Sequence, residues 1–242
     1  MPYNSPVNRN SWGGSARGFP TDVEFDLGLR QYMLRVYNFM AGGLLLTGAV
    51  AHAAITTGFY QQIVGTPLMW VVLLAPLGAV LLLGFRIERM STGAAQAIFW
   101  GYAALMGLSL AGLLLLYTGT SVARVFFISA ATFGAMSLYG YTTQRDLSQF
   151  GAFLFMGLIG IVLASLVNIF VGSTALQFVI SVIGVLVFTG LTAWDTQRIK
   201  EVYLASDPRD VLAKKALMGA LTLYLDFINL FVMLLQFAGQ RR

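Results

Sequence analysis

Seven long apolar runs divide this chain, and each is long enough to cross a lipid bilayer as a helix. They cover residues 33–57, 67–85, 94–117, 122–141, 150–171, 175–199 and 216–238. A helix needs about 20 apolar residues to span the hydrocarbon core, whereas a barrel strand needs about 10 and alternates in polarity. Because the runs are continuous, they predict an all-α, polytopic membrane protein with seven transmembrane helices. Only 10% of the residues are charged, against about 25% in a typical soluble domain, which agrees with this class.

The composition also excludes several kinds of function. The chain has no cysteine, which rules out disulfides and thiolate chemistry. It contains no glycine-rich nucleotide loop, Walker motif or HExxH metal motif, and we expect no cofactor. The net charge of +5 does not indicate nucleic acid, because the basic residues lie at the ends of the runs rather than on one face. We therefore expect the lipid bilayer, ions and other membrane proteins as partners.

The basic residues also predict the orientation of the chain. With seven crossings, all but three of the 15 Lys and Arg residues fall on one side, and the exceptions are Arg124, Arg241 and Arg242. Cytoplasmic loops carry an excess of Lys and Arg, so the N-terminus and the connection between the sixth and seventh runs are predicted to be cytoplasmic. Residues 1–30 are polar and are expected to form a mobile tail that offers a binding site for other membrane proteins. Residues 31–242 form the predicted seven-helix domain.

Two features predict how the helices pack. Short connections, such as residues 58–66 and 119–121, favour successive helices as antiparallel neighbours. Small residues at helix-contact spacing favour close approach of adjacent helices, for example Ala130 with Gly134 and Gly160 with Ala164.

Two aspartates interrupt the apolar runs. Asp226 lies near the middle of residues 216–238, and Asp195 lies near the predicted cytoplasmic end of residues 175–199. A carboxylate inside the membrane costs several kcal/mol unless it is paired, protonated or hydrated. If the two helices are antiparallel neighbours, the carboxyl groups lie at similar depths. Two carboxylates at short range cannot both ionise cheaply, so the pair is expected to act as a proton switch or a cation site.

Simpler roles stay open for each aspartate. Asp195 follows Trp194 and also fits a carboxylate that extends to the cytoplasmic interface beside an aromatic-belt residue. Asp226 also fits a structural residue that is hydrogen-bonded inside the bundle, with Tyr224 and Asn229 as the nearest polar partners in sequence.

A basic residue on the same predicted side offers a partner for Asp195. Arg86 closes the second run and is a candidate latch that pairs with ionised Asp195 and releases it on protonation. Arg89 is equally eligible, and an orientation charge among the lipid headgroups is the alternative role. Calcium prefers about six to eight oxygen ligands, so Asp195 and Asp226 alone predict only a weak, transient calcium site.

Three stretches carry a resemblance to a known family. They are LYLDFINLF in the last run, WDTQRIK in the sixth, and LYGYTTQRDLSQFGAFLFMGLIGIVLASLVNIF across the fourth and fifth. Over all seven runs the sequence resembles a bacterial member of the transmembrane Bax-inhibitor-motif family. The resemblance implies six helices around a central seventh, in the inner (plasma) membrane, and a pH-dependent calcium leak. It also implies that Asp195 and Asp226 form a di-aspartyl pH sensor and that Arg86 lies near the position of a latch arginine.

The leading hypothesis is therefore a non-enzymatic, proton-gated calcium leak channel. In this hypothesis ionised Asp195 pairs with Arg86 and closes the cytoplasmic mouth, and protonation of the aspartyl pair opens it. An intramembrane aspartyl protease is one alternative, although the residues before Asp226 are large where such enzymes have Gly-x-Gly. A non-conducting interaction protein that acts through residues 1–30 is another. A proton-coupled carrier is not favoured, because no inverted repeat is evident in the sequence.

Overall fold

The computed structural model describes residues 22–242, with side chains from Leu27 onwards. Seven of the helices in this range are long and apolar enough to cross a membrane, which confirms the all-α, seven-helix class. A short helix and one 3-10 turn complete the set of elements. These elements are α1 (Asp22–Thr56), α2 (Phe59–Ile63), α3 (Pro67–Arg86), η1 (Ile87–Arg89), α4 (Thr92–Leu115), α5 (Gly119–Thr142), α6 (Ser148–Val171), α7 (Thr174–Glu201) and α8 (Arg209–Ala238).

Local sequence signals set several of the helix ends. Ser91, Thr118 and Ser173 are the N-caps of α4, α5 and α7, and each side chain accepts a hydrogen bond from a backbone N–H in the first turn. Such caps satisfy donors that the first turn of a helix leaves unpaired. Gly172 follows the end of α6 in a left-handed conformation with a φ of 64°, which glycine adopts without strain. The predicted ends of α3 to α7 therefore agree with the structure to within a turn.

The first and last helices are longer than the predicted runs. Residues 22–30, which were expected to belong to the polar tail, form the first turns of α1, and residues 209–215 form the first turns of α8. Adding a residue to an existing helix is far easier than nucleating one, so polar turns extend from apolar helices without an apolar signal of their own. The short helix α2 lies within the predicted connection at residues 58–66. The rest of the predicted tail, residues 1–21, lies outside the described residues.

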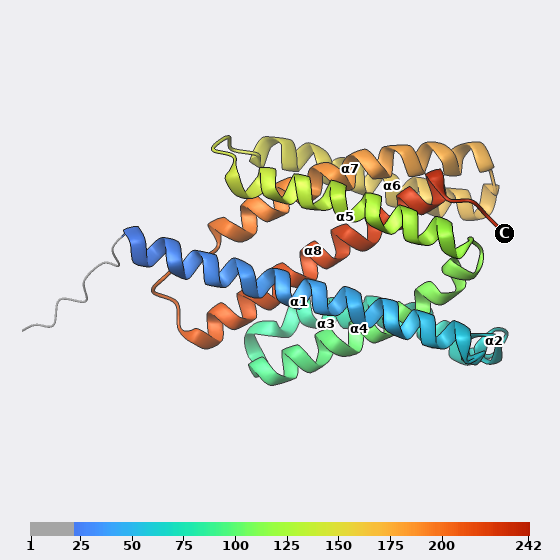
Figure 1. Cartoon of the computed structure of the whole chain (residues 1–242), viewed down its shortest axis with the longest axis horizontal. Helices are drawn as coiled ribbons and strands as arrows, with labels where there is room; N and C mark the ends of the chain where they lie inside the picture. Colours follow the sequence, from blue (N-terminus) through green and yellow to red (C-terminus); the bar gives the residue numbers. More distant parts are fainter. Residues whose placement is uncertain (1–21) are drawn as a thin grey trace, which may run out of the picture.

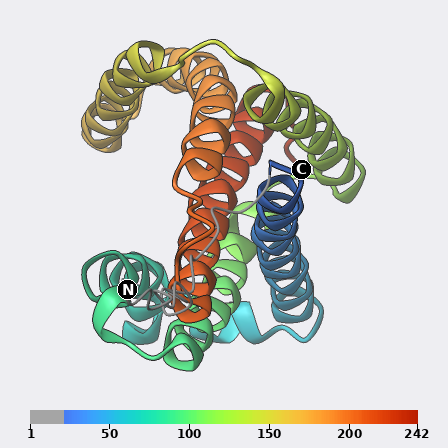
Figure 2. The same cartoon turned by 90° about the vertical axis from the view of Figure 1, so that its left-hand side faces the viewer.

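Helix α8 is the centre of the bundle. It packs against α1, α4, α5 and α7, and its residues Leu217, Ala220, Leu223 and Leu230 are almost completely buried. Figure 1 shows α8 crossing between a layer formed by α1, α3 and α4 and a layer formed by α5, α6 and α7. Figure 2 shows α8 in the middle of the same arrangement, with helices on both sides of it. The prediction of a central seventh transmembrane helix is confirmed.

Within each layer, the first two helices pack on the third. Helices α1 and α3 both pack on α4, and α5 and α6 both pack on α7. The expectation that short connections make successive helices neighbours is therefore wrong at the two connections given as examples, whereas α3 and α4, and α6 and α7, do pack as successive neighbours. Helix α1 leads through α2 to α3 but packs on α4 and α8, and α5 follows α4 but packs on α7 and α8. The short connections make successive helices run in opposite directions, whereas the burial of apolar side chains against α4, α7 and α8 decides which helices are in contact.

The two layers repeat one packing pattern in opposite directions. Each layer crosses the membrane three times, so α5 starts on the side opposite to the start of α1.

Close helix contacts occur at glycines that the spacing argument did not select. A Cβ added at Gly107 of α4 would meet a backbone carbonyl of α1, and one added at Gly140 of α5 would meet a backbone carbonyl of α7. Helices approach this closely only where no side chain intervenes. Gly134 and Gly160, which were predicted as contact positions, have no such neighbour within 4 Å. That prediction was wrong for these two glycines, because Gly134 lines a cavity between α1 and α5 and Gly160 is exposed, whereas Ala130 and Ala164 do pack against the core.

Candidate functional site

Asp195 of α7 and Asp226 of α8 form a buried pair of carboxyl groups. Their side chains lie within hydrogen-bonding range of each other, and the two residues are only 8% and 5% exposed. Both belong to helices that qualify as membrane spans. The structure thus brings together the two residues that the apolar runs singled out, on the facing sides of two helices that pack along each other.

The connection between α7 and α8 fixes the register of these two helices. Lys215, in the second turn of α8, folds back on this connection. Its Nζ lies 2.6 Å from Asp207 Oδ2 and donates to the Val202 carbonyl at 3.0 Å. Further along, Gly219 of α8 lies directly against the side chain of Ile199 on α7. The start of α8 is therefore held against the end of α7, and this contact determines which residues of the two helices face each other.

One oxygen of the carboxyl pair has no hydrogen-bond partner within the described residues. This oxygen is Asp226 Oδ2, which is buried. The hydroxyl of Tyr224, one of the partners considered for Asp226, lies 2.6 Å from Thr47 Oγ1 instead. Thr47 in turn donates to the Ala103 carbonyl at 2.8 Å, which joins α1, α4 and α8. A buried oxygen without a donor is unfavourable, so the surroundings of Asp226 favour a proton or a cation at this position.

A cavity of about 530 Å³ extends to Asp195 from the end of the bundle that holds the α7–α8 connection. We call this cavity the vestibule. Its charged lining consists of Glu88, Asp195, Arg198, Lys214 and Lys215. Lys214 Nζ donates to the backbone carbonyl of Glu88 at 3.2 Å, which joins the start of α8 to the η1 turn. The mouth on the predicted cytoplasmic side is therefore mainly basic, and it is bridged by a contact between α8 and η1.

A second cavity, of about 480 Å³, reaches the carboxyl pair from the side, between α6 and α8. We call it the α6–α8 cavity. Both aspartates and Asn229 line it, and it shares Asp195, Arg198 and Thr222 with the vestibule. Asp195 therefore lines both cavities, one at the polar end of the bundle and one between its helices, whereas Asp226 lines only the second.

Arg198 is the basic residue that faces Asp195. It follows Asp195 by three residues on α7, lines both cavities and acts electrostatically on the Asp195 carboxyl. Sequence reasoning passed over Arg198, although a spacing of three on a helix places two side chains on the same face. In the part of the chain that the structure describes, one ion pair lies within 4 Å, and neither Arg86 nor Arg89 takes part in it. The latch role of Arg86 stays a prediction.

The site offers few ligands to a metal ion. Among the side chains that the structure describes, from Leu27 to Arg242, no group of three or more His, Cys, Asp or Glu lies together. Asp195, Asp226 and Asn229 fall short of the oxygen set that calcium prefers. The arrangement suits a proton or a cation in transit better than a resident metal.

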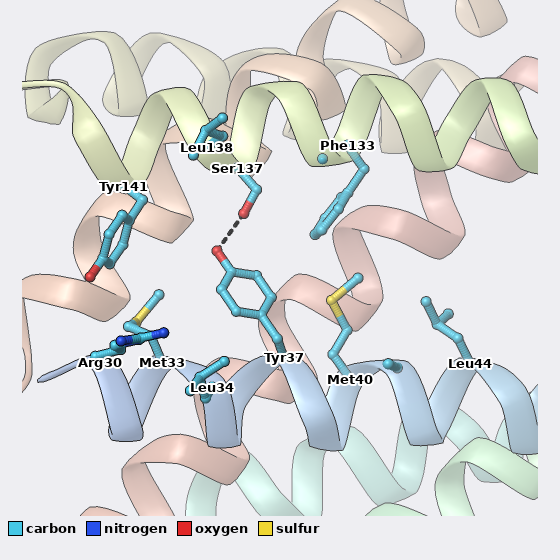
Figure 3. Close-up of a pocket in the computed structure, with 12 residues that line it drawn as sticks. Arg30, Met33, Leu34, Tyr37, Met40, Leu44, Phe133, Ser137, Leu138 and Tyr141 are labelled. Atoms are coloured by element: carbon cyan, nitrogen blue, oxygen red, sulfur yellow. Dashed lines mark hydrogen bonds between the residues drawn. The ribbon is translucent and has the colours of Figure 1, made fainter. Parts of the chain in front are cut away.

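A third cavity, mainly apolar and of about 680 Å³, lies between α1 and α5 (Figure 3). Tyr37 of α1 and Ser137 of α5 point toward each other across it, and their hydroxyl oxygens are 2.6 Å apart. Ser137 Oγ lies 3.0 Å from Thr196 Oγ1 of α7, and Thr196 is the residue after Asp195. This chain of hydroxyl groups joins the two layers beside the site. No sequence motif signals this chain of hydroxyl groups, because the fold brings these residues together.

These features define a class of protein. It is a seven-helix membrane protein in which two layers of three helices enclose a central helix, and that helix presents a buried carboxyl group to a second carboxyl group on its neighbour. Residues 29–242 match the family described as "Inhibitor of apoptosis-promoting Bax1", and the chain belongs to this Bax inhibitor family.

The chain is similar to bacterial proteins over most of its length. It is 52% identical over 219 residues to an uncharacterized protein of Rickettsia prowazekii, with 90% of this chain and 93% of the relative covered. It is 49% identical over 219 residues to the inner membrane protein YbhL of Escherichia coli K12, with 89% and 94% covered. It is 44% identical over 243 residues to a protein of Caulobacter vibrioides, with 95% and 97% covered. The family resemblance carried by the sequence motifs is confirmed.

Proposed function

We propose that this protein is a pH-sensitive calcium leak channel of the inner membrane, gated by Asp195 and Asp226. One observation carries the proposal: two buried carboxyl groups face each other, and one of them, Asp195, lines both the vestibule and the α6–α8 cavity. Carboxyl groups at this range share a proton or hold a cation between them. No protein donor occupies the buried Asp226 Oδ2 within the described residues, so a proton or a cation that enters the pair finds an oxygen without a partner there.

Weak binding suits a leak pathway. In the open state the pair has taken up a proton, and Arg198 offsets the negative charge that remains, so that the oxygens of the pair bind a cation only weakly. An ion conducts only if it leaves a site as readily as it enters, and a divalent cation at such a site is attracted without being trapped. Asp195, Asp226 and Asn229 offer too few oxygen ligands to hold a resident calcium ion, and the same weak binding lets a calcium ion pass through.

The gate works through the charge of Asp195. Ionised Asp195 attracts basic side chains at the vestibule, with Arg198 on its own helix and Arg86 as the latch of the leading hypothesis. Protonation of the pair removes this attraction, and the bridge from Lys214 to the Glu88 carbonyl opens with the mouth. The protonated fraction rises as the pH falls, so calcium flux increases from about pH 8 to about pH 6.

We propose no catalytic role for the pair. An aspartyl protease needs the backbone of a peptide to approach both carboxyl groups, which small residues before the second aspartate permit. In this chain Leu223 and Tyr224 are completely buried at that position. The Tyr224 ring packs edge-to-face on Tyr102 and Phe99, with ring centroids 5.3 and 6.4 Å apart. This packing leaves no room for a substrate backbone. Cleavage of a membrane reporter that an aspartate-to-asparagine change abolished would contradict this part of the proposal.

Location and partners complete the proposal. The relative YbhL is by name an inner membrane protein, and this chain has seven helices that are able to span a membrane. We place the N-terminus and the α7–α8 connection in the cytoplasm, because this orientation puts most of the basic residues inside. The partners are calcium ions, protons and the lipid bilayer, together with other membrane proteins that bind the segment at residues 1–30.

Calcium uptake by liposomes that contain the purified chain tests this function. We expect uptake that increases as the pH is lowered from about 8 to about 6, and no uptake in liposomes without protein. A wild-type protein that conducts no calcium at any pH in this range would contradict the proposal and would favour an interaction protein that acts through residues 1–30.

A further inference from the structure

The α6–α8 cavity has an apolar wall that faces the membrane. Helices α6, α7 and α8 all contribute to its apolar lining, which consists of Phe155, Leu158, Phe188, Leu191, Trp194 and Leu225. Phe155 lies at the outer edge and is 53% exposed. Helix α6 is the least buried of the seven membrane-spanning helices, so this edge opens toward lipid rather than toward water. An apolar molecule dissolved in the bilayer therefore reaches the cavity from the side.

The inner end of the same cavity is charged. Asp195, Asp226, Asn229 and Arg198 line it, and Asp226 Oδ2 is buried without a hydrogen-bond partner in the described part of the chain. An ammonium group that displaces the proton shared by the two carboxyl groups leaves two carboxylates and the Arg198 guanidinium group, which together carry one negative charge for the ammonium group to neutralise. The cavity thus combines a long apolar wall with an acidic end, and it presents a hydrogen-bond acceptor that lacks a donor.

We propose that the α6–α8 cavity binds a lipophilic amine in its protonated form. The ammonium group donates to Asp226 Oδ2, and the alkyl chain lies along Phe155 and Leu158 and extends into the bilayer. The acyl chain of a neutral lipid fits the wall but leaves Asp226 without a donor, and an anionic headgroup is repelled by the excess negative charge.

The cavity shares its two aspartates with the proposed leak pathway. A bound ammonium group occupies the oxygen that calcium would use, so the amine blocks flux. The inference rests on the proposed function only for this consequence, because binding itself needs no ion movement. Binding is therefore measured without calcium, and a protein that conducts nothing still tests it.

Trp194 serves as a local reporter of binding. The chain has four tryptophans, and replacing Trp12, Trp70 and Trp100 by Phe leaves the one in the cavity. We titrate this variant, in detergent micelles at neutral pH, with N,N-dimethyldodecylamine and separately with 1-dodecanol, which has the same chain without the charge. The amine is expected to change the Trp194 emission saturably, and the alcohol is expected not to. Asp226→Asn in the same background lowers the affinity for the amine by about tenfold or more, because the charge partner is lost.

A matched pair of variants separates the cavity from the membrane surface of α6. Leu158 lines the cavity, whereas its neighbour Ile159 is 47% exposed on the outside of the helix. By calorimetry of the otherwise wild-type protein, Leu158→Trp is expected to weaken amine binding, and Ile159→Trp is expected to leave it unchanged. Equal responses to the amine and the alcohol indicate a site for lipid chains only and overturn the proposal. Unchanged binding in both Asp226→Asn and Leu158→Trp also overturns it.

Discussion

Arg198 follows Asp195 by three residues on α7, so the guanidinium group that acts on the carboxyl pair belongs to the same helix as one of its members. This relationship separates two roles that a single latch arginine would otherwise combine. Arg198 moves with Asp195 and tunes how readily the pair takes up a proton, whereas a residue on another helix, such as Arg86 on α3, is needed to hold two helices together. The two arginines are therefore expected to affect flux in different ways.

Replacing each arginine by glutamine distinguishes these roles. Removing the positive charge of Arg198 disfavours the ionised pair, so protonation and opening occur at higher pH. We expect Arg198→Gln to move the midpoint of the flux-against-pH curve upward by about one pH unit. Arg86→Gln is expected to raise the flux at high pH, where the latch otherwise holds, with a smaller effect on the midpoint. Calcium uptake by liposomes measures both quantities, and an unchanged midpoint in Arg198→Gln would show that its charge does not act on the sensor.

The glycine at the α5–α7 contact gives a prediction about stability. A Cβ at Gly140 meets a backbone carbonyl of α7, which cannot move aside easily. Gly140→Ala is therefore expected to destabilise the protein by about 1–3 kcal/mol. Gly134, on the same helix, has nothing within 4 Å, so Gly134→Ala is expected to be neutral or slightly stabilising through helix propensity. Thermal unfolding in detergent compares the two, and equal unfolding temperatures would contradict the close contact.

The orientation in the membrane is testable because the chain has no cysteine. Single cysteines at Ser206, in the α7–α8 connection, and at Thr66, before α3, introduce labels at exposed positions on opposite sides of the bundle. In intact cells, a thiol reagent that does not cross the inner membrane is expected to label Thr66→Cys and to spare Ser206→Cys. The reverse pattern would show that the positive-inside argument assigns the wrong orientation.

Much of the fold was predictable because the membrane imposes it. A bilayer requires helices of a fixed minimum length, and apolar runs report that length directly, as the agreement for α3 to α7 shows. The neighbours of α1 and α5 were not predictable from connection lengths. Helix α1 packs on α4 because its buried residues fit there, and the short path through α2 to α3 does not prevent this. The polar first turns of α1 and α8 were missed because no apolar pattern marks them.

Of the residues at the candidate site, only the two aspartates were predictable from the sequence. Asp195 and Asp226 stood out because a carboxyl group is costly inside an apolar run. Arg198 was overlooked since it lies at the polar end of α7 among residues that orientation alone explains. The link from Ser137 to Thr196 depends on contacts between α5 and α7, and the α6–α8 cavity depends on the packing of three helices. No local sequence pattern predicts either the Ser137–Thr196 contact or the α6–α8 cavity.

The most direct test of the central claim is the pH dependence of calcium flux in Asp195→Asn, Asp226→Asn and the double variant. Asp146→Asn is the matched control. Asp146 is exposed in the α5–α6 connection, and hydrogen bonds from the side chain and backbone of Ser148 hold its pKa below the usual range, so it does not titrate between about pH 6 and pH 8. If the two aspartates form one sensor, each single variant loses the pH dependence, the double variant adds nothing further, and the control behaves like wild type. A wild-type pH profile that survives in both single variants would contradict the claim.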